Sequence, residues 1–314
     1  MPNDPAAPVS VVLPTREWTP ACAELAAQVG PADEFLVACD GPSDPVVDAA
    51  EGTAATVVVA GEPTGCSAKC NALAAGLERA SRDRLVCTDA DFEHGEEWLA
   101  TVRRLLARVP EGHVLSTAPV LASEGPVGKL LEPSSAVGVA TSVRFDSGVW
   151  GGTMAFRRGE VDVDAYVADL RRTAGDDALL AERADGIETA RSLVREMPVD
   201  GTLCGTLSRR VRWTRMGLYL DPAGIATRAL LPLAVIAGTL AAPFVTVPLV
   251  TGVAAAAYAA LGVHRWTFLL AVPGYALALL LLCYGLARDE FEWTGRRYRW
   301  ESLYDVTVLD PDGK

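Results

Sequence analysis

Five aspartates occur in three short stretches of the chain, and their types and spacing could serve one reaction. Asp40 follows an apolar run, Asp89 and Asp91 follow another as Asp-Ala-Asp, and Asp176 and Asp177 are adjacent. Hard divalent cations prefer oxygen ligands, and one or two carboxylates suffice when substrate phosphates and water complete the shell. A further aspartate can act as a general base. The acids therefore predict Mg2+- or Mn2+-assisted chemistry on a substrate with a diphosphate leaving group.

Each of these acids also has a purely structural interpretation. Asp40 precedes Gly41 and Pro42 and can form a turn. Asp91 can cap a helix. Asp176 and Asp177 precede an apolar segment at the expected start of a helix, where the helix dipole favours acidic residues.

Basic residues in two places could contact an anionic ligand. Lys69 is one of three lysines in the chain and lies at an expected helix N-terminus near Asn71, although a chance surface lysine is also compatible. The second place is the run Arg209-Arg210-Val211-Arg212-Trp213. It is typical of an interfacial amphipathic helix with snorkelling arginines, and we expect part of it to face the active site as well.

The N-terminal half alternates short apolar runs with helical patterns, which predicts an α/β fold with a mostly parallel sheet. Expected strands cover residues 9–13, 34–39, 55–60 and 84–88, and expected helices cover 20–28, 68–80 and 96–107. The stretch 114–156 is strand-like and Gly-rich, and 163–193 has a helical pattern. Ligands of such folds bind outside the carboxyl ends of the strands, where Asp40 and Asp89 are expected.

Two long apolar runs predict membrane insertion. No charged side chain occurs in residues 229–263 or 266–287, and about 20 such residues can cross a bilayer. Pro243 and Pro248 could divide the first run into a hairpin, giving three crossings, but arginines on both sides of the runs favour two. The N-terminus lacks a signal-peptide pattern. We therefore expect a multi-pass protein of the cell membrane with a cytosolic catalytic domain.

Composition excludes several other classes of protein. A net charge of −12 argues against binding nucleic acid through phosphate contacts. The seven cysteines form no CxxC pair and the three histidines are scattered, which argues against a zinc site. The expected organisation is a catalytic domain over 1–205, an interfacial segment over 206–228, two or three membrane helices over 229–287, and a cytosolic tail over 288–314.

The order of these motifs resembles family 2 glycosyltransferases with a GT-A fold, and within them the ceramide glucosyltransferase-like membrane group. The similar blocks are VSVVLPT, DGPSD, GCSAKCNAL, TDADF, GGTMAFRR, AGDD, the RxxRW signature at Arg209–Trp213 and the closing WTGRRYR. The resemblance implies a nucleotide-sugar donor, with a UDP-hexose expected, and a lipid acceptor. The acceptor could be a polyprenyl phosphate, a diacylglycerol or ether lipid, a terpenoid or a sphingolipid.

The resemblance also implies roles for individual residues. Asp177 would be the base of an inverting single displacement, with Asp176, Arg212 and Trp213 beside it in the catalytic set. Asp91 and Asp89 would bind the metal. The donor would be bound by Pro14, Thr15, Asp40, Lys69, Asn71, Asp89 and Arg209.

Two other functions fit parts of the pattern. A processive polysaccharide synthase shares the RxxRW signature, but its translocating pore needs more membrane helices than the sequence offers. An inactive scaffold or nucleotide-sugar sensor in the membrane would not need the full set of acids. We therefore expect a membrane glycosyltransferase of glycolipid biosynthesis.

Overall fold

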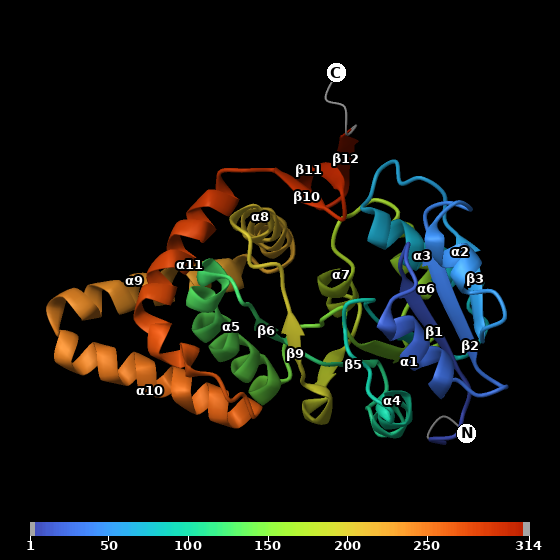
Figure 1. Ribbon diagram of the computed structural model, residues 1–314, viewed down its shortest axis with the longest axis horizontal. Helices are drawn as coiled ribbons and strands as arrows, with labels where there is room; N and C mark the ends of the chain where they lie inside the picture. The colour runs from blue at the N-terminus through green and yellow to red at the C-terminus, as the bar shows by residue number, and fades with distance from the viewer. Residues whose placement is uncertain (1–3, 310–314) are drawn as a thin grey trace. The chain divides into compact units, whose positions relative to one another are not determined.

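The computed structural model describes residues 4–309, which form two compact units (Figure 1). Of the described residues, the first unit contains Asp4–Ala118, Asp146–Leu193 and Tyr304–Val308. The second contains Pro119–Phe145, Val194–Leu303 and Leu309. Residues 119–145 group with the C-terminal helices in this division, and the expected domain organisation stays a prediction.

The first unit is built on a seven-stranded sheet with the order β3-β2-β1-β4-β7-β5-β8. Its strands are β1 (Val9–Pro14), β2 (Glu34–Cys39), β3 (Ala55–Val59), β4 (Arg84–Cys87), β5 (His113–Ser116), β7 (Met154–Arg157) and β8 (Gly186–Thr189). All neighbours pair in parallel except β7, which is antiparallel to both β4 and β5. The predicted α/β fold with a mostly parallel sheet is confirmed.

Helices cover both faces of this sheet. They are α1 (Pro20–Gln28), α2 (Pro45–Ala49), α3 (Ala68–Arg79), α4 (Trp98–Leu106), α6 (Val163–Leu170) and α7 (Asp177–Ala181), with a short 3-10 turn at Arg191–Leu193. Strand β12 (Asp305–Leu309) follows much later in the chain. The expected helices near residues 20–28, 68–80 and 96–107 and the first four expected strands are confirmed.

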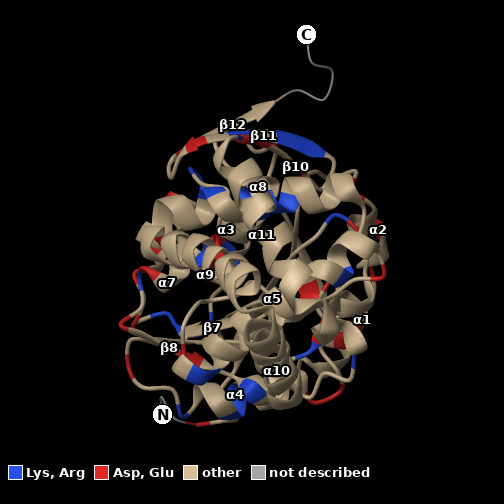
Figure 2. Ribbon diagram, turned by 90° about the vertical axis from the view of Figure 1, so that its left-hand side faces the viewer, with Lys and Arg blue, Asp and Glu red and all other residues tan. Residues whose placement is uncertain are grey.

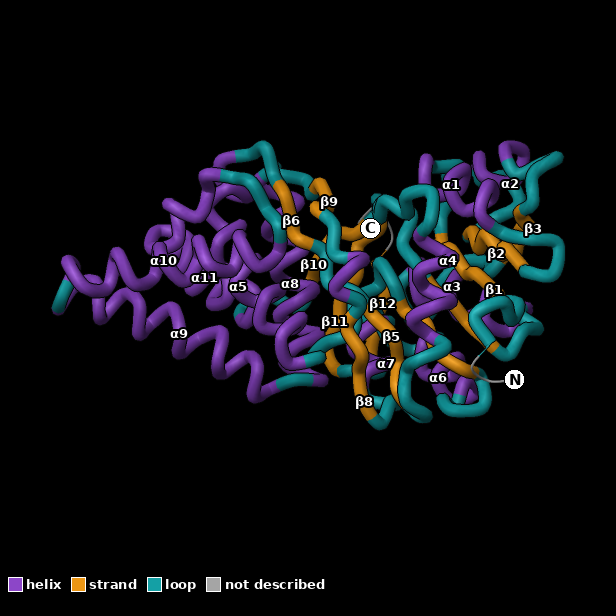
Figure 3. Tube along the Cα trace, turned by 90° about the horizontal axis from the view of Figure 1, so that it is seen from below, coloured by secondary structure: helices purple, strands orange, loops and turns teal. Residues whose placement is uncertain are grey.

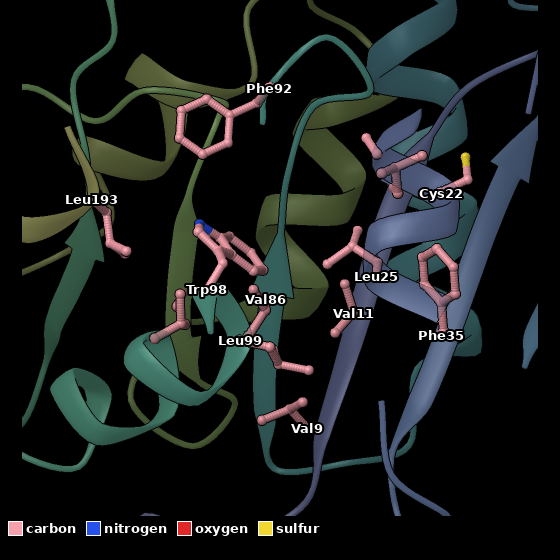
Figure 4. Packing of buried hydrophobic residues seen from close by; sticks show 14 of the residues in the cluster. Val9, Val11, Cys22, Leu25, Phe35, Val86, Phe92, Trp98, Leu99 and Leu193 are labelled. Atoms are coloured by element: carbon pink, nitrogen blue, oxygen red, sulfur yellow. The ribbon is translucent and has the colours of Figure 1, made fainter. Parts of the chain in front are cut away.

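The two faces of the sheet form separate hydrophobic cores because side chains alternate along each strand. Val9 and Val11 of β1 pack with α1 and α4, where Leu25 and Trp98 are buried (Figure 4). Val12 points to the other face and packs with residues of α3, α6 and α7. The sheet is therefore held between helices on both sides, and its edges carry the functional loops.

The second unit is mainly helical (Figure 3). Its helices are α5 (Pro126–Phe145), α8 (Leu203–Leu220), α9 (Pro222–Ala241), α10 (Pro243–Leu261) and α11 (Ala271–Leu286), with a 3-10 turn at Trp266–Leu270 before α11. Strands β6 (Val120–Ala122) and β9 (Glu196–Pro198) pair in parallel, and β10 (Glu290–Trp293) pairs with β11 (Arg296–Ser302) in antiparallel fashion. The expectation of strands throughout 114–156 is wrong, because α5 occupies 20 of these residues.

Three helices of this unit are long and apolar enough to cross a membrane: α9, α10 and the segment Trp266–Leu286. Figure 2 shows α10 and α11 without any acidic or basic residue. The first apolar run is divided at Ala242, directly before Pro243, as the hairpin interpretation predicted. Leu240 and Phe244 beside this turn are 82% and 94% exposed, which is the exposure expected of side chains that contact lipid.

A buried ionic network fixes the loop before α11 to α5. Glu132 is 4% exposed, and each of its carboxylate oxygens accepts two hydrogen bonds. Oε1 accepts from Ser123 N at 2.8 Å and from Arg265 Nη2 at 3.0 Å. Oε2 accepts from Arg265 Nε at 3.2 Å and from the hydroxyl of Thr267. The hydrogen-bonding capacity of Glu132 is therefore filled, and Arg265 also lies near two exposed glutamates, Glu124 and Glu196.

Candidate active site

The carboxyl ends of β1, β2 and β4 bring three predicted site segments to one edge of the sheet. These strands are direct neighbours. Backbone hydrogen bonds continue just beyond the strands, from Thr15 N to Ala38 O (2.8 Å) and from Thr88 N to Val12 O (3.1 Å). Thr15, Asp40 and Asp89 therefore follow adjacent strand ends, where α/β folds bind their ligands.

Lys69 joins two of the predicted acidic motifs. Its Nζ lies 2.7 Å from Asp89 Oδ1 and 2.8 Å from Asp176 Oδ2. Lys69 is in the first turn of α3, whose N-cap residue Ser67 accepts a hydrogen bond from Cys70 N. The backbone N–H of Ser67 also donates to Thr173 O at 3.0 Å, which brings the start of α3 next to the Asp176 segment.

The cluster carries more negative than positive charge. Burial alone would lower the pKa of Lys69, but Asp176, Asp89 and Asp177 outweigh it and raise that pKa well above its ordinary value. Burial raises the pKa of Asp89, and Asp176 and Asp91 add to the rise while Lys69 opposes it. One ammonium thus faces several carboxylates, so the site favours a further cation.

Asp177 has the environment of a general base. It is the first residue of α7, and its Oδ1 accepts a hydrogen bond from Ala178 N at 2.8 Å. Burial and the neighbouring Asp176 raise the pKa of Asp177 to about 6. The adjacent backbone is held by Tyr166, whose hydroxyl donates to Asp176 O at 3.0 Å. A carboxylate with a pKa near 6 is ionised at neutral pH and is a better proton acceptor than an ordinary aspartate.

Asp89 and Asp91 fit a divalent cation that is shared with a diphosphate. No group of three or more potential protein ligands exists within residues 4–309. Mg2+ in phosphate-transferring sites is commonly held by only one or two carboxylates, with substrate phosphates and water as the other ligands. Asp91 is exposed and Asp89 is half-buried, and the charge of Asp91 contributes to the raised pKa of Asp89. They would hold the cation on the solvent side of Lys69.

Asp40 lies in a second polar group at the same sheet edge. It is 5% exposed, and Arg16 Nε lies 3.7 Å from its Oδ2 and 3.1 Å from Asp44 Oδ1. Asp44 also accepts from Gly41 N at 2.8 Å, which closes the turn after β2. Pro14 and Thr15 are half-buried. Their contact with a donor stays a prediction.

Asn71 is engaged by the protein itself. Its side-chain N–H donates to Gly61 O at 2.7 Å, and its side-chain oxygen accepts from Arg171. These bonds fasten α3 to the loop after β3 and to the end of α6. A contact between Asn71 and the donor stays a prediction.

Gly151 is a site residue that the sequence reasoning missed. A Cβ atom at this position would lie 2.6 Å from both Asp89 Oδ2 and Lys69 Nζ. At the next residue, Gly152, a Cβ would lie 2.8 Å from the Phe92 ring. The signal was present in the Gly-Gly pair before β7, because consecutive glycines beside a strand often mark close approach of backbone to a functional group.

The RxxRW residues lie on α8 in the second unit. The Arg209 and Arg210 guanidiniums each lie 5.7 Å from the centre of the Trp213 ring, and Arg212 lies 3.6 Å from that of Trp293. Burial and the charge of Arg212 lower the pKa of Arg209. This crowding of positive charge suits an anionic ligand, and the assignment of Arg209, Arg212 and Trp213 to the reaction stays a prediction.

A comparison with protein families decides the assignment. The model of glycosyl transferase family 21 matches residues 47–302. The chain belongs to glycosyl transferase family 21. As a family 21 member it is a glycosyltransferase, and the resemblance to the ceramide glucosyltransferase-like group is confirmed. No curated protein matches the chain.

Several solved structures resemble this family 21 chain weakly. A mannosyltransferase of Pyrobaculum calidifontis, in complex with GDP-mannose and Mn2+, is 20% identical, with a TM-score of 0.47 over 90% of this chain and 87% of the other. Glucosyl-3-phosphoglycerate synthase of Mycobacterium tuberculosis is 18% identical, with a TM-score of 0.39 over 63% and 72%. Mannosyl-3-phosphoglycerate synthase of Rubrobacter xylanophilus is 15% identical, with a TM-score of 0.40 over 67% and 74%. The assignment rests on the family match.

Proposed function

We propose that this family 21 protein is a membrane-anchored inverting glycosyltransferase. It moves a hexose from a nucleotide sugar, a UDP-hexose by expectation, to a lipid acceptor in a single displacement. The observation that carries the proposal is the double ion pair of Lys69 with Asp89 and Asp176. It joins the Asp-x-Asp segment and the Asp176-Asp177 segment, which are far apart in the chain, in one charged site.

Asp177 is the base in this proposal. It accepts the proton of the acceptor hydroxyl as that oxygen forms its bond to the anomeric carbon of the donor sugar, while the bond from that carbon to the diphosphate breaks. Attack from the face opposite the leaving group inverts the configuration, and one carboxylate is enough for this step. The neighbouring Asp176 is instead engaged in an ion pair with Lys69.

Asp89 and Asp91 would hold Mg2+ or Mn2+ against the donor diphosphate. When bound, the cation supplies Lewis-acid stabilisation of the departing nucleoside diphosphate. Lys69 opposes the rise in the pKa of Asp89 through their ion pair, and Asp40 is left to contact the nucleoside. Charge neutralisation at the leaving group is the largest electrostatic need of such a reaction.

The lipid acceptor and the membrane location are supported by the second unit. Three of its helices have the length and composition of membrane spans. Four arginines of α8 precede them, as is typical of a segment on the cytosolic surface of a membrane. In this proposal α8 lies at that surface, and Arg212 and Trp213 take part in binding the donor or the acceptor. The catalytic unit is on the cytosolic side, and the protein crosses the membrane more than once.

The proposal is tested by transfer in vitro. Purified protein with Mn2+ is incubated with a panel of UDP- and GDP-sugars and a lipid extract of the native host, and products are identified by mass spectrometry. We expect a glycolipid with one added hexose and an inverted anomeric configuration by NMR. Asp177→Asn, which keeps the shape of the side chain, should bind the nucleotide but form no product. Retention of configuration would contradict the single displacement, and hydrolysis of the donor alone by both proteins would contradict transfer to lipid.

A further inference from the structure

A chain of buried hydrogen bonds connects the Asp-x-Asp segment to the loop before β7. Thr88 and His94, which flank Asp89 and Asp91, are 1% and 2% exposed. Thr88 Oγ1 lies 2.8 Å from His94 Nε2 and 2.7 Å from Gly152 O. Neither side chain takes part in the chemistry proposed above.

The direction of these bonds follows from the number of protons. The Gly152 carbonyl can only accept, so the single hydroxyl proton of Thr88 is donated to it. The same carbonyl also accepts from the hydroxyl of the adjacent Thr153 at 2.7 Å. His94 must then donate from Nε2 to Thr88 Oγ1. Burial lowers the pKa of His94 to about 4, so its ring is neutral at physiological pH and carries its one proton on Nε2. The chain therefore runs from His94 through Thr88 to Gly152.

The His94 ring is held in place for this donation. It packs edge-on against Phe92 and Trp98, with ring centres 5.6 Å and 4.5 Å away. The His94 backbone N–H also donates to Glu24 Oε2 at 2.7 Å, which fixes it to α1. The donor end of the chain thus has little freedom to move.

The accepting end of the chain lies at the proposed cation and diphosphate site. Gly152 follows Gly151, whose backbone lies against Asp89 and Lys69 so closely that even a methyl group would collide with both side chains. The same loop is fixed on its other side by Ser116, whose hydroxyl accepts from Trp150 N at 2.9 Å. Thr88 and Ser116 thus hold the loop from both sides.

We propose that Thr88 and His94 are positioning residues that press the Gly151–Gly152 backbone against the Lys69–Asp89 pair and so fix the direction of the Asp89 carboxylate. This inference rests on the proposed function, in which the Asp89 carboxylate binds the cation of the donor diphosphate. When the hydrogen bond to Gly152 is lost, the loop relaxes, Lys69 and Asp89 gain freedom, and the cation and nucleotide bind less tightly.

The test compares two substitutions at one position. Thr88→Val keeps the shape but removes the hydroxyl, whereas Thr88→Ser keeps the hydroxyl. We expect Thr88→Val to raise both the Kd of Mn2+ and the KM of the donor by about tenfold, the equivalent of one well-placed hydrogen bond. The Kd of Mn2+ is measured by electron paramagnetic resonance in the presence of UDP or GDP. Thr88→Ser should stay within about twofold of the wild type.

A matched control separates this effect from a general loss of stability. Thr117 is also fully buried in the first unit and donates to a backbone carbonyl, that of Ala190, at 3.4 Å. Thr117→Val should lower the melting temperature without changing the Kd of Mn2+. If Thr88→Val fails to fold, His94→Phe removes the Nε2–H while filling the same space, and a smaller rise in the same Kd is expected.

Three outcomes would overturn the inference. Unchanged Mn2+ and donor binding in folded Thr88→Val or His94→Phe protein would show that the chain of bonds positions nothing. An equal rise in the Kd of Mn2+ in Thr117→Val would show that the effect comes from a general loss of stability. A wild-type protein that binds neither nucleotide with Mn2+ would contradict the proposed function itself, and this inference would fall with it.

Discussion

The two units each contain a buried ionic cluster, and the clusters differ in how completely they are neutralised. In the second unit the guanidinium of Arg265 faces the buried Glu132, and backbone and hydroxyl donors fill the remaining positions on that carboxylate. The two other glutamates near Arg265, Glu124 and Glu196, are exposed to solvent. In the first unit the single ammonium of Lys69 faces Asp89 and Asp176, with Asp177 nearby. We call the group around Glu132 and Arg265 the closed cluster, because its buried carboxylate has no free position for a ligand. The group around Lys69 has excess negative charge and can attract a cation.

The difference separates a structural role from a catalytic one. Burying a charged pair stabilises a fold only when its geometry and hydrogen bonds are complete, as they are around Glu132. The excess charge around Lys69 disfavours the fold and raises pKa values, which is the pattern found at functional sites. If the two clusters differ in this way, a substitution in one should change the reaction and a substitution in the other should change stability.

The largest effect is expected for the base. Asp177→Asn should lower kcat by about 10²- to 10⁴-fold, the usual contribution of general base catalysis, with little change in nucleotide binding. Its melting temperature at pH 7 should rise, because burial disfavours the charged form that the substitution removes. Single-turnover kinetics and thermal unfolding check both parts. A variant with near-normal turnover would assign the base elsewhere.

The next effect concerns the closed cluster. Arg265→Met leaves Glu132 buried and without its ion-pair partner, which should cost about 3–5 kcal/mol of the free energy of unfolding in detergent. Lys129→Met is the matched control, because its partner Glu124 is exposed and that pair should contribute little. At temperatures where Arg265→Met is folded, its donor KM should equal that of the wild type. A changed KM in folded protein would mean that the closed cluster also serves the reaction.

Much of this architecture could be predicted from the sequence, because two strand-like runs end at Asp40 and Asp89 and the apolar runs 229–263 and 266–287 contain no charged residue. The stretch 126–145 was misjudged because its valines favour strands, while its glycines and Pro133 weaken the helix pattern. There, packing in the second unit overrides local propensity. The pairing of Lys69 with Asp176 depends on a distant backbone bond, from Ser67 to Thr173, that no local pattern encodes.

A smaller effect is expected from pH. Because the pKa of Asp177 is raised to about 6, the base is ionised above that pH and becomes protonated below it. The rate of transfer at saturating donor and metal should therefore be level above about pH 7 and fall toward tenfold per unit below pH 6. Lowering the pH to 5 should not weaken nucleotide binding to the same extent. A rate that stays level down to pH 5 would contradict the assignment of Asp177.

The smallest effects are expected from two glycines, one beside each cluster. At Gly151 an added methyl group would meet the side-chain ends of Asp89 and Lys69, which can move aside. Gly151→Ala should therefore raise the donor KM several-fold, roughly the value of a weakened hydrogen bond, with little loss of stability. At Gly128 the methyl group would lie 2.0 Å from Ser123 Oγ and 2.2 Å from its Cβ, so the backbone itself must shift.

Gly128→Ala should therefore cost about 1–3 kcal/mol of stability, the usual price of overpacking, and leave the donor KM unchanged in folded protein. Gly159→Ala is the control for both, since its methyl group would meet no atom within 4 Å. Donor kinetics and thermal unfolding of the three variants give a direct contrast. The added methyl group at each glycine acts through the cluster that it touches. A loss of stability with unchanged donor KM in Gly151→Ala, together with a raised donor KM and unchanged stability in Gly128→Ala, would therefore contradict the roles assigned to the two clusters.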